Sequence, residues 1–318
     1  MAGTRKTAVA VVLAALALTA TACNDNADKG ADKNAAPAAP TSAAATTPAG
    51  TPSAAPTGGA KPEKASPAVY LEQVTQKTGA AKSAKITETI TIGDNAMKGT
   101  GAVSWADGLQ GELTMDMSRS PMGKLISVLT GSESASYRFT KDGMYMRVDG
   151  DALGALDGKH WLHYSAADQA KASGGTTEQF KDADPVDGVR RLIATGKVTE
   201  VGDETVAGKA TTHYSGVLNA DEIAKASGKG LSQEKLDQIK QKLAASGITS
   251  ERIDVWVDTD QLVVQRTETG DTAAGAFKAS VLYSDYGTRV ETTAPPASDV
   301  AEASALSKAG KGAGTATG

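Results

Sequence analysis

The feature that most constrains the fold of this chain is an alternation of apolar and polar residues with a period of two. Isoleucine occupies positions 86, 90 and 92, while threonine occupies positions 87, 89 and 91. Because successive side chains of a β-strand point to opposite faces, this run predicts a strand with one apolar face. Similar alternation at 102–105 and 113–117, with Asp-Gly and Gly-Asp-Asn turn signals between the runs, predicts a meander of antiparallel strands.

The same signals continue along the chain and predict an α+β fold. Further strands are predicted at 137–140, 144–148, 161–164, 197–201, 209–217, 251–257, 261–267 and 277–283. Helices are predicted at 67–82, from Pro185 to Gly196, at 220–228 and at 232–246, from Ser-Pro, Asp-Pro and capping-box signals at their starts. A sheet of about ten strands rarely stays flat. We therefore expect a curved antiparallel sheet, a half-barrel, with helices covering its concave face. Residues 120–130 are mildly apolar and irregular, with Gly123 and Gly131 as candidate hinges, and they predict either a lid over this face or a loop packed on the sheet.

Both ends of the chain lack the large apolar residues that a core requires. Residues 24–66 are almost all Ala, Pro, Thr, Ser, Lys, Gly, Asp and Asn, and residues 294–318 are similar. Such segments bury too little apolar surface to offset the entropy of ordering the backbone. The expected organisation is a signal peptide at 1–22, a lipidated cysteine with a disordered tether at 23–66, a folded domain at 67–293 and a disordered tail at 294–318.

The N-terminus predicts export and a lipid anchor. Arg5 and Lys6 precede an apolar run from 8 to 18, and Ala20-Thr-Ala-Cys23 follows it. A charged start, a short apolar run and small residues describe a secretory signal peptide, and Cys23 directly after it resembles a lipobox. Ala20 departs from the leucine that is commonest there, so an ordinary cleaved signal remains the alternative. Cys23 is the only cysteine of the chain, which favours the anchor and places the domain at the outer face of the cell membrane.

Composition and motifs argue against several functional classes. A net charge of −4, without a basic block in the domain, excludes the dense cationic face of a nucleic-acid binder. His160 and His163 lie an odd number of positions apart and would point to opposite faces of a strand. His213 is expected to have a structural, hydrogen-bonding role. Asp254 would point outward and Asp258 would close a turn, so we expect neither paired-carboxylate catalysis nor a metal, a cofactor or an enzyme.

Apolar side chains on the predicted inner face are the best candidates for a binding site. The candidates are Ile86, Ile90, Val103, Leu113, Met115, Met117, Met144, Met146, Val189, Ile193, Ile239, Leu243, Val255 and Val257. Methionine is unbranched and adaptable, which suits a site that accepts flexible chains. The alternative is that these residues form a plain core without a cavity.

Two stretches carry a resemblance to a known family. They are Val201-Gly-Asp-Glu-Thr-Val-Ala-Gly-Lys-Ala-Thr-Thr-His-Tyr-Ser215 and Ile253-Asp-Val-Trp-Val-Asp258 with Leu262-Val-Val-Gln-Arg266. With the lipobox, they resemble actinobacterial lipoproteins of the LppX/LprG type, whose fold is like that of the LolA carrier. The resemblance implies an open half-barrel that binds an acylated lipid or glycolipid without catalysis, in a membrane-anchored protein that we expect to be monomeric. The alternative is an interaction or signalling lipoprotein of the cell envelope with a filled core.

Overall fold

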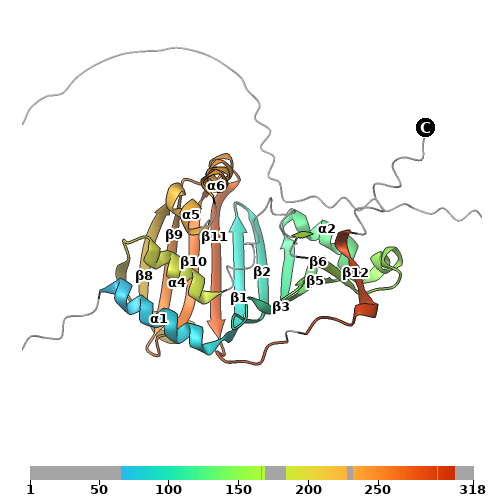
Figure 1. Ribbon diagram of the computed structural model, residues 1–318, viewed down its shortest axis with the longest axis horizontal. Helices are drawn as coiled ribbons and strands as arrows, with labels where there is room; N and C mark the ends of the chain where they lie inside the picture. The colour runs from blue at the N-terminus through green and yellow to red at the C-terminus, as the bar shows by residue number, and fades with distance from the viewer. Residues whose placement is uncertain (1–65, 166, 169–183, 228–231, 292, 305–318) are drawn as a thin grey trace, which may run out of the picture. The chain divides into compact units, whose positions relative to one another are not determined.

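One large sheet organises the folded part of the chain (Figure 1). The computed structural model describes residues 66–165, 167–168, 184–227, 232–291 and 293–304. The predicted signal peptide, Cys23 and the tether lie outside the described residues. The strands follow the order β12-β6-β5-β4-β3-β2-β1-β11-β10-β9-β8-β7, and β1 pairs with β11, so the two halves of the chain meet at the centre of the sheet. The prediction of an α+β fold with a curved, mostly antiparallel sheet is confirmed.

The strands alternate with short helices along the chain. The strands are β1 Ser83–Ile92, β2 Asn95–Ser104, β3 Gln110–Arg119, β4 Ser134–Thr140, β5 Gly143–Arg147, β6 Trp161–Ser165, β7 Thr199–Val206, β8 Lys209–Asn219, β9 Ser250–Asp258, β10 Val263–Thr272, β11 Gly275–Ser284 and β12 Val300–Glu302. The helices are α1 Pro67–Ala81, α2 Pro121–Thr130, α4 Pro185–Ala194, α5 Ala220–Ser227 and α6 Gln233–Ala245, with 3-10 turns η1 Gly150–Leu156 and η3 Ala297–Asp299. No helix in the described ranges is long and apolar enough to span a membrane.

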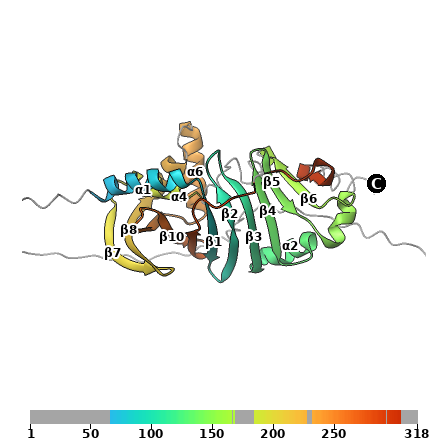
Figure 2. The ribbon, with the colours of Figure 1, turned by 90° about the horizontal axis from the view of Figure 1, so that it is seen from below.

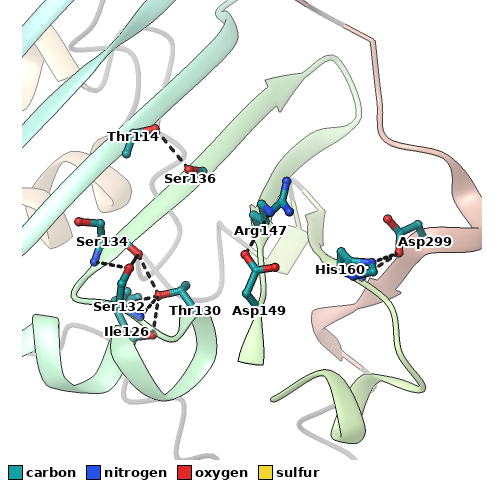
Figure 3. A network of polar contacts seen from close by, with 10 residues as sticks. All are labelled: Thr114, Ile126, Thr130, Ser132, Ser134, Ser136, Arg147, Asp149, His160 and Asp299. Carbon is teal, nitrogen blue, oxygen red and sulfur yellow. Dashed lines mark hydrogen bonds and ion pairs between the residues drawn. The ribbon is translucent and has the colours of Figure 1, made fainter. Parts of the chain in front are cut away.

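The predicted domain end at residue 293 is wrong, because the sheet continues with β12. This short strand pairs in parallel with β6 and brings the sheet to twelve strands instead of about ten. The backbone N–H of His160 donates to Asp299 Oδ1 over 2.9 Å, and His160 Nδ1 lies 2.8 Å from the same oxygen (Figure 3). Contacts with residues about 140 positions earlier in the sequence therefore hold β12 in place. The composition of this end of the chain gives no sign of those contacts.

Residues 120–130 form a helix, so the expectation of an irregular lid or loop is wrong. Gly123 is not a hinge: a Cβ there would overlap the carbonyl oxygen of Met117, so only glycine lets α2 pack this closely on β3. Thr130 Oγ1 lies within hydrogen-bond distance of the carbonyl oxygens of Ile126 and Ser134, which ties the end of α2 to β4 (Figure 3).

Capping residues begin α4 and α5 as predicted. The Val186 amide donates to Asp184 Oδ1 over 2.8 Å at the start of α4. At the start of α5, Asn219 and Glu222 accept hydrogen bonds from each other's backbone amides, so the predicted capping box is confirmed.

The helices lie against one face of the curved sheet, as expected. Figure 2 shows α1 and α4 lying across the strands around β8 and β10. The Tyr70 ring of α1 stacks on Tyr214 of β8 with centroids 5.6 Å apart, and Leu192 of α4 is fully buried beside Gly216. Towards the other end of the sheet, α2 packs on β3 and β4, and η1 packs on α2. We call the face that these helices cover the inner face.

Candidate functional site

The strand register brings the predicted site residues onto the inner face. Ile86 is opposite Gly101 on β2, which is opposite Leu113 on β3. The row continues through Tyr137 on β4 to Met146 on β5. Residues that are opposite each other on neighbouring strands point to the same face, and so do residues two positions apart on one strand. By these two rules every candidate that lies on a strand points to the inner face.

The candidates divide into buried and partly exposed sets. Those buried in the core are Ile86, Val103, Leu113, Met115, Met117, Met146, Val189, Val255 and Val257. Those that keep some exposed surface are Ile90, Met144, Ile193, Ile239 and Leu243. The buried set stabilises the fold, and a ligand can reach only the second set without rearrangement of the core.

A small apolar pocket lies where α5 and α6 approach the ends of β9, β10 and β11. We call it the apolar pocket; its volume is about 120 Å³. It is lined by Ile223, Leu243, Ile248, Ser250, Glu251, Gly270, Asp271, Thr272 and Phe277. Leu243 is the one lining residue among the sequence candidates. Ile223 lies in α5, Ile248 in the loop between α6 and β9, and Phe277 in β11. No local pattern in the sequence indicates that they meet.

Half-buried apolar residues extend from the pocket across the centre of the inner face. Phe277 of the pocket is opposite Ile92 on β1. Two positions further along each strand, Ala279 is opposite Ile90, and Ile90 is opposite Met97 on β2. These five residues, which we call the central stripe, are all partly exposed. Since neighbouring strands are about 4.8 Å apart, the stripe continues the pocket as an apolar surface across three strands.

A buried cluster of charged residues borders the apolar pocket. Arg191 of α4 reaches Glu251 Oε2 over 2.6 Å and Glu268 Oε1 over 3.1 Å. Arg266, which is only 2% exposed, lies 3.2 Å from the same Glu268 oxygen. Burial and the neighbouring Glu268 raise the pKa of Glu251 to about 7. Burial would also raise the pKa of Glu268, but the Arg266 and Arg191 guanidinium groups lower it below its usual value.

The histidines form structural contacts on the sheet. His213 bridges two carboxylates, with Nδ1 2.9 Å from Glu204 Oε1 and Nε2 2.9 Å from Asp254 Oδ1, and it stacks on Trp256. Its predicted hydrogen-bonding role is confirmed. His163 contacts Glu302, whereas His160 contacts Asp299. Within the described ranges, no group of three His, Cys, Asp or Glu side chains could hold a metal ion.

Two larger hollows are more open and more polar than the apolar pocket. One, of about 450 Å³, is lined by Lys197, Thr199, Val201, Ser215, Gly216, Val217, Asn219, Glu222 and Arg252. The other, of about 620 Å³, is lined by Tyr70, Asp203, Glu204, Thr205, Ala210, Thr211, Thr212, Val257, Asp258 and Thr259. Asp258 is committed to the β9–β10 turn, where it accepts from the amides of Asp260 and Leu262, as its predicted turn role requires. A hydrocarbon chain would contact more polar atoms in either hollow than in the apolar pocket.

Comparisons with known proteins find relatives of the chain among Streptomyces proteins. No family model matches the sequence. A 31.2 kDa protein from the rplA–rplJ intergenic region of Streptomyces griseus is 41% identical over 253 residues, which cover 78% of this chain and 82% of the relative. A Streptomyces coelicolor protein, provisionally named a lipoprotein, is 30% identical over 77% of this chain and 82% of its own length. The chain belongs to the family of these Streptomyces proteins.

Solved structures of lipoproteins are also similar to the chain. LppX of Mycobacterium tuberculosis is 12% identical over 72% of this chain and 100% of its own, with a TM-score of 0.42. LprF of Mycobacterium bovis is 16% identical over 71% of this chain and 96% of its own, with a TM-score of 0.41. The predicted resemblance to LppX-type lipoproteins is confirmed.

Proposed function

We propose that this chain is a membrane-anchored lipoprotein that binds an acylated lipid or glycolipid on its inner face and catalyses no reaction. The observation that carries the proposal is the continuity of the apolar pocket with the central stripe. Together they form an apolar surface that begins in the pocket and is partly exposed along its length. A hydrocarbon chain is the ligand that such a surface fits, since each buried CH₂ contributes about 0.8 kcal/mol.

The volume of the pocket limits how much of the lipid it can hold. At about 120 Å³ it is smaller than the roughly 300–1,000 Å³ of pockets that enclose a whole drug-sized ligand. It therefore accommodates the end of one acyl chain, while the remaining chain lies along Phe277, Ile92 and Met97. The polar part of the lipid stays outside this apolar surface.

The proposed anchor at Cys23 supports the same function. A diacylglycerol on Cys23 would hold the domain beside a source of lipids at the outer face of the membrane. If Cys23 is the anchor, a Cys23→Ala protein is released into the soluble fraction of cells. Its persistence in the membrane fraction would contradict the anchor and leave lipid binding to be tested separately.

A second candidate is a non-enzymatic interaction or signalling lipoprotein with a filled core. The observation that favours it is the complete burial of many predicted lining residues, such as Val103, Val189 and Val255. On this alternative the central stripe contacts another protein, and no lipid is bound.

Lipid extraction separates the two candidates. The full chain carrying Cys23→Ala is purified without detergent, and organic extracts are examined by mass spectrometry. We expect a co-purifying acylated lipid near one equivalent. Leu243→Trp, which fills the apolar pocket, should abolish it. Leu236→Trp on the same helix, outside the pocket lining, is the matched control and should retain it. A folded protein without lipid, which also takes up no fluorescent acyl probe, would contradict lipid binding and favour the filled core.

A further inference from the structure

The hollow of about 450 Å³ lies at the β7 end of the sheet and shares no lining residue with the apolar pocket (Figure 2). We call it the cationic hollow, because Lys197 and Arg252 line it. Thr199 of β7 is opposite Ser215 of β8. Two positions further along β8, Val217 is opposite Arg252 of β9. The strand register therefore gathers these lining side chains on one face of the sheet.

This face is the outer one, opposite to α4. Gly216 lies between Ser215 and Val217, and a Cβ added to it would be 2.6 Å from Leu192 Cδ1 of α4. Gly216 thus faces the inner side of the sheet, so its two neighbours in the sequence face the outer side. A ligand held by the side chains of Ser215 and Val217 would not compete for space with a ligand on the inner face.

The charged side chains of the cationic hollow favour an anion. Lys197 and Arg252 are exposed, and neither forms an ion pair with a carboxylate in the described part of the chain. Glu222 is the one carboxylate among the lining residues, and its Oε2 accepts the backbone amide of Asn219 over 2.8 Å. Two positive charges therefore face one negative charge, which is engaged in the cap of α5.

A buried hydroxyl adds a hydrogen-bond donor beside one of the cations. Ser215 is only 5% exposed, and its Oγ accepts a hydrogen bond from Arg252 Nη1 over 3.0 Å. A hydroxyl that accepts one hydrogen bond still has a proton to donate, and no acceptor for that proton lies among the described residues. An oxyanion beside Arg252 would accept from this hydroxyl and from the remaining N–H groups of the guanidinium.

Exposed apolar side chains line the same hollow. Val201 is 54% exposed and Val217 is 42% exposed. Within the ranges that the structure describes, only two other large apolar side chains are exposed, Val69 in α1 and Val128 in α2. Because covering apolar surface is favourable by about 25 cal/mol per Å², a ligand with an apolar part gains affinity from the two valines of the hollow.

We propose that the cationic hollow binds an anionic amphiphile, in which an oxyanion such as a phosphate or a carboxylate is joined to a hydrocarbon group. The oxyanion contacts Arg252, Ser215 and Lys197, while the hydrocarbon group lies on Val201 and Val217. This inference goes beyond the proposed function, because the site lies on the other face of the sheet and does not require a lipid in the apolar pocket.

Isothermal titration calorimetry with three probes tests this inference. Octyl phosphate carries both parts of the proposed ligand, octanol carries only the hydrocarbon, and inorganic phosphate carries only the oxyanion. The full chain carrying Cys23→Ala is titrated with each probe at concentrations at which octyl phosphate forms no micelles. We expect octyl phosphate to bind at least about tenfold more tightly than either other probe, and its affinity to decrease as salt is added.

Substitutions show where the probe binds. Arg252→Gln removes the guanidinium and should weaken the binding of octyl phosphate about tenfold or more. Lys98→Gln removes an exposed cation of β2, outside the cationic hollow, and is the matched control that should keep the affinity. Leu243→Trp fills the apolar pocket and should also keep it. Circular dichroism verifies that each variant is folded.

Each outcome bears on the inference. Binding of octyl phosphate that Arg252→Gln weakens, and that Lys98→Gln and Leu243→Trp retain, supports it. Equal affinity for octyl phosphate and either other probe would overturn it, because one part of the ligand would then contribute nothing. Equal weakening by Arg252→Gln and Lys98→Gln would overturn it as well.

Two further outcomes separate this inference from the proposed function. Loss of octyl phosphate binding in Leu243→Trp would place the probe in the apolar pocket, which overturns the cationic hollow as its site and supports the proposed function. An absence of octyl phosphate binding in the parent protein would overturn this inference, while lipid extraction would still decide the proposed function.

Discussion

Gly188→Ala should destabilise the protein, although alanine is normally the better helix residue. Gly188 lies within α4 directly above the Arg266 side chain, and a Cβ added there would overlap Arg266 Cδ and lie 2.7 Å from Nη1. Arg266 is 2% exposed and bound to Glu268, so it cannot move into solvent without losing that ion pair. Overpacking a core costs about 1–3 kcal/mol, while replacing a helical glycine by alanine gains about 0.8–1.0 kcal/mol. We expect a net loss of about 1–2 kcal/mol of unfolding free energy, since the ion pair weakens as well.

Gly79→Ala is the matched control for this prediction. Gly79 is also helical, in α1, but its added Cβ would meet only Val186 Cγ2 at 3.7 Å, an ordinary contact. This variant should gain about 0.5–1 kcal/mol. Urea unfolding of both variants, followed by circular dichroism, measures the two changes. Equal stabilisation by the two substitutions would refute the reasoning, because it would mean that α4 does not press on Arg266.

Other substitutions test the helix cap, the core and the last strand. Asp184→Ala removes the cap of α4 and should cost about 1 kcal/mol in urea unfolding; no change would mean that the start of α4 frays. Leu192→Ala, at a fully buried position, should cost about 2–5 kcal/mol in the same assay, and a smaller cost would indicate a loosely packed helix. Asp299→Ala removes both contacts with His160. It should speed amide exchange at 300–302 with little effect on global stability, and unchanged exchange would contradict the anchoring role of Asp299.

The sequence predicted those elements whose signals are local. The alternation from Ile86 to Ile92 predicted β1, and the Asp184-Pro185 and Asn219–Glu222 signals predicted the starts of α4 and α5. β12 was missed because three residues carry too little pattern and depend on pairing with β6. α2 was missed because Gly123 was interpreted as a hinge, whereas its role is close packing on β3.

The candidate site was predicted only in part, because it depends on register. The period of two places Ile90 and Met115 on one face, but it does not say which strands are neighbours. The pairing of Ile92 with Phe277 joins positions 185 residues apart, and that pairing builds the central stripe. Glu251 reads locally as an ordinary polar residue at the start of a strand. Only the fold brings Arg191 and Glu268 to Glu251, and so makes it part of the buried charged cluster.

Native mass spectrometry of the full chain carrying Cys23→Ala, prepared without detergent, tests the central claim most directly. Lipid binding at the apolar pocket predicts a population whose mass exceeds that of the protein by one lipid, and whose extra mass disappears on collisional activation. Leu243→Trp should remove this population, and Leu236→Trp should keep it. A single peak at the mass of the lipid-free protein, unchanged after incubation with acylated lipids, would contradict the account.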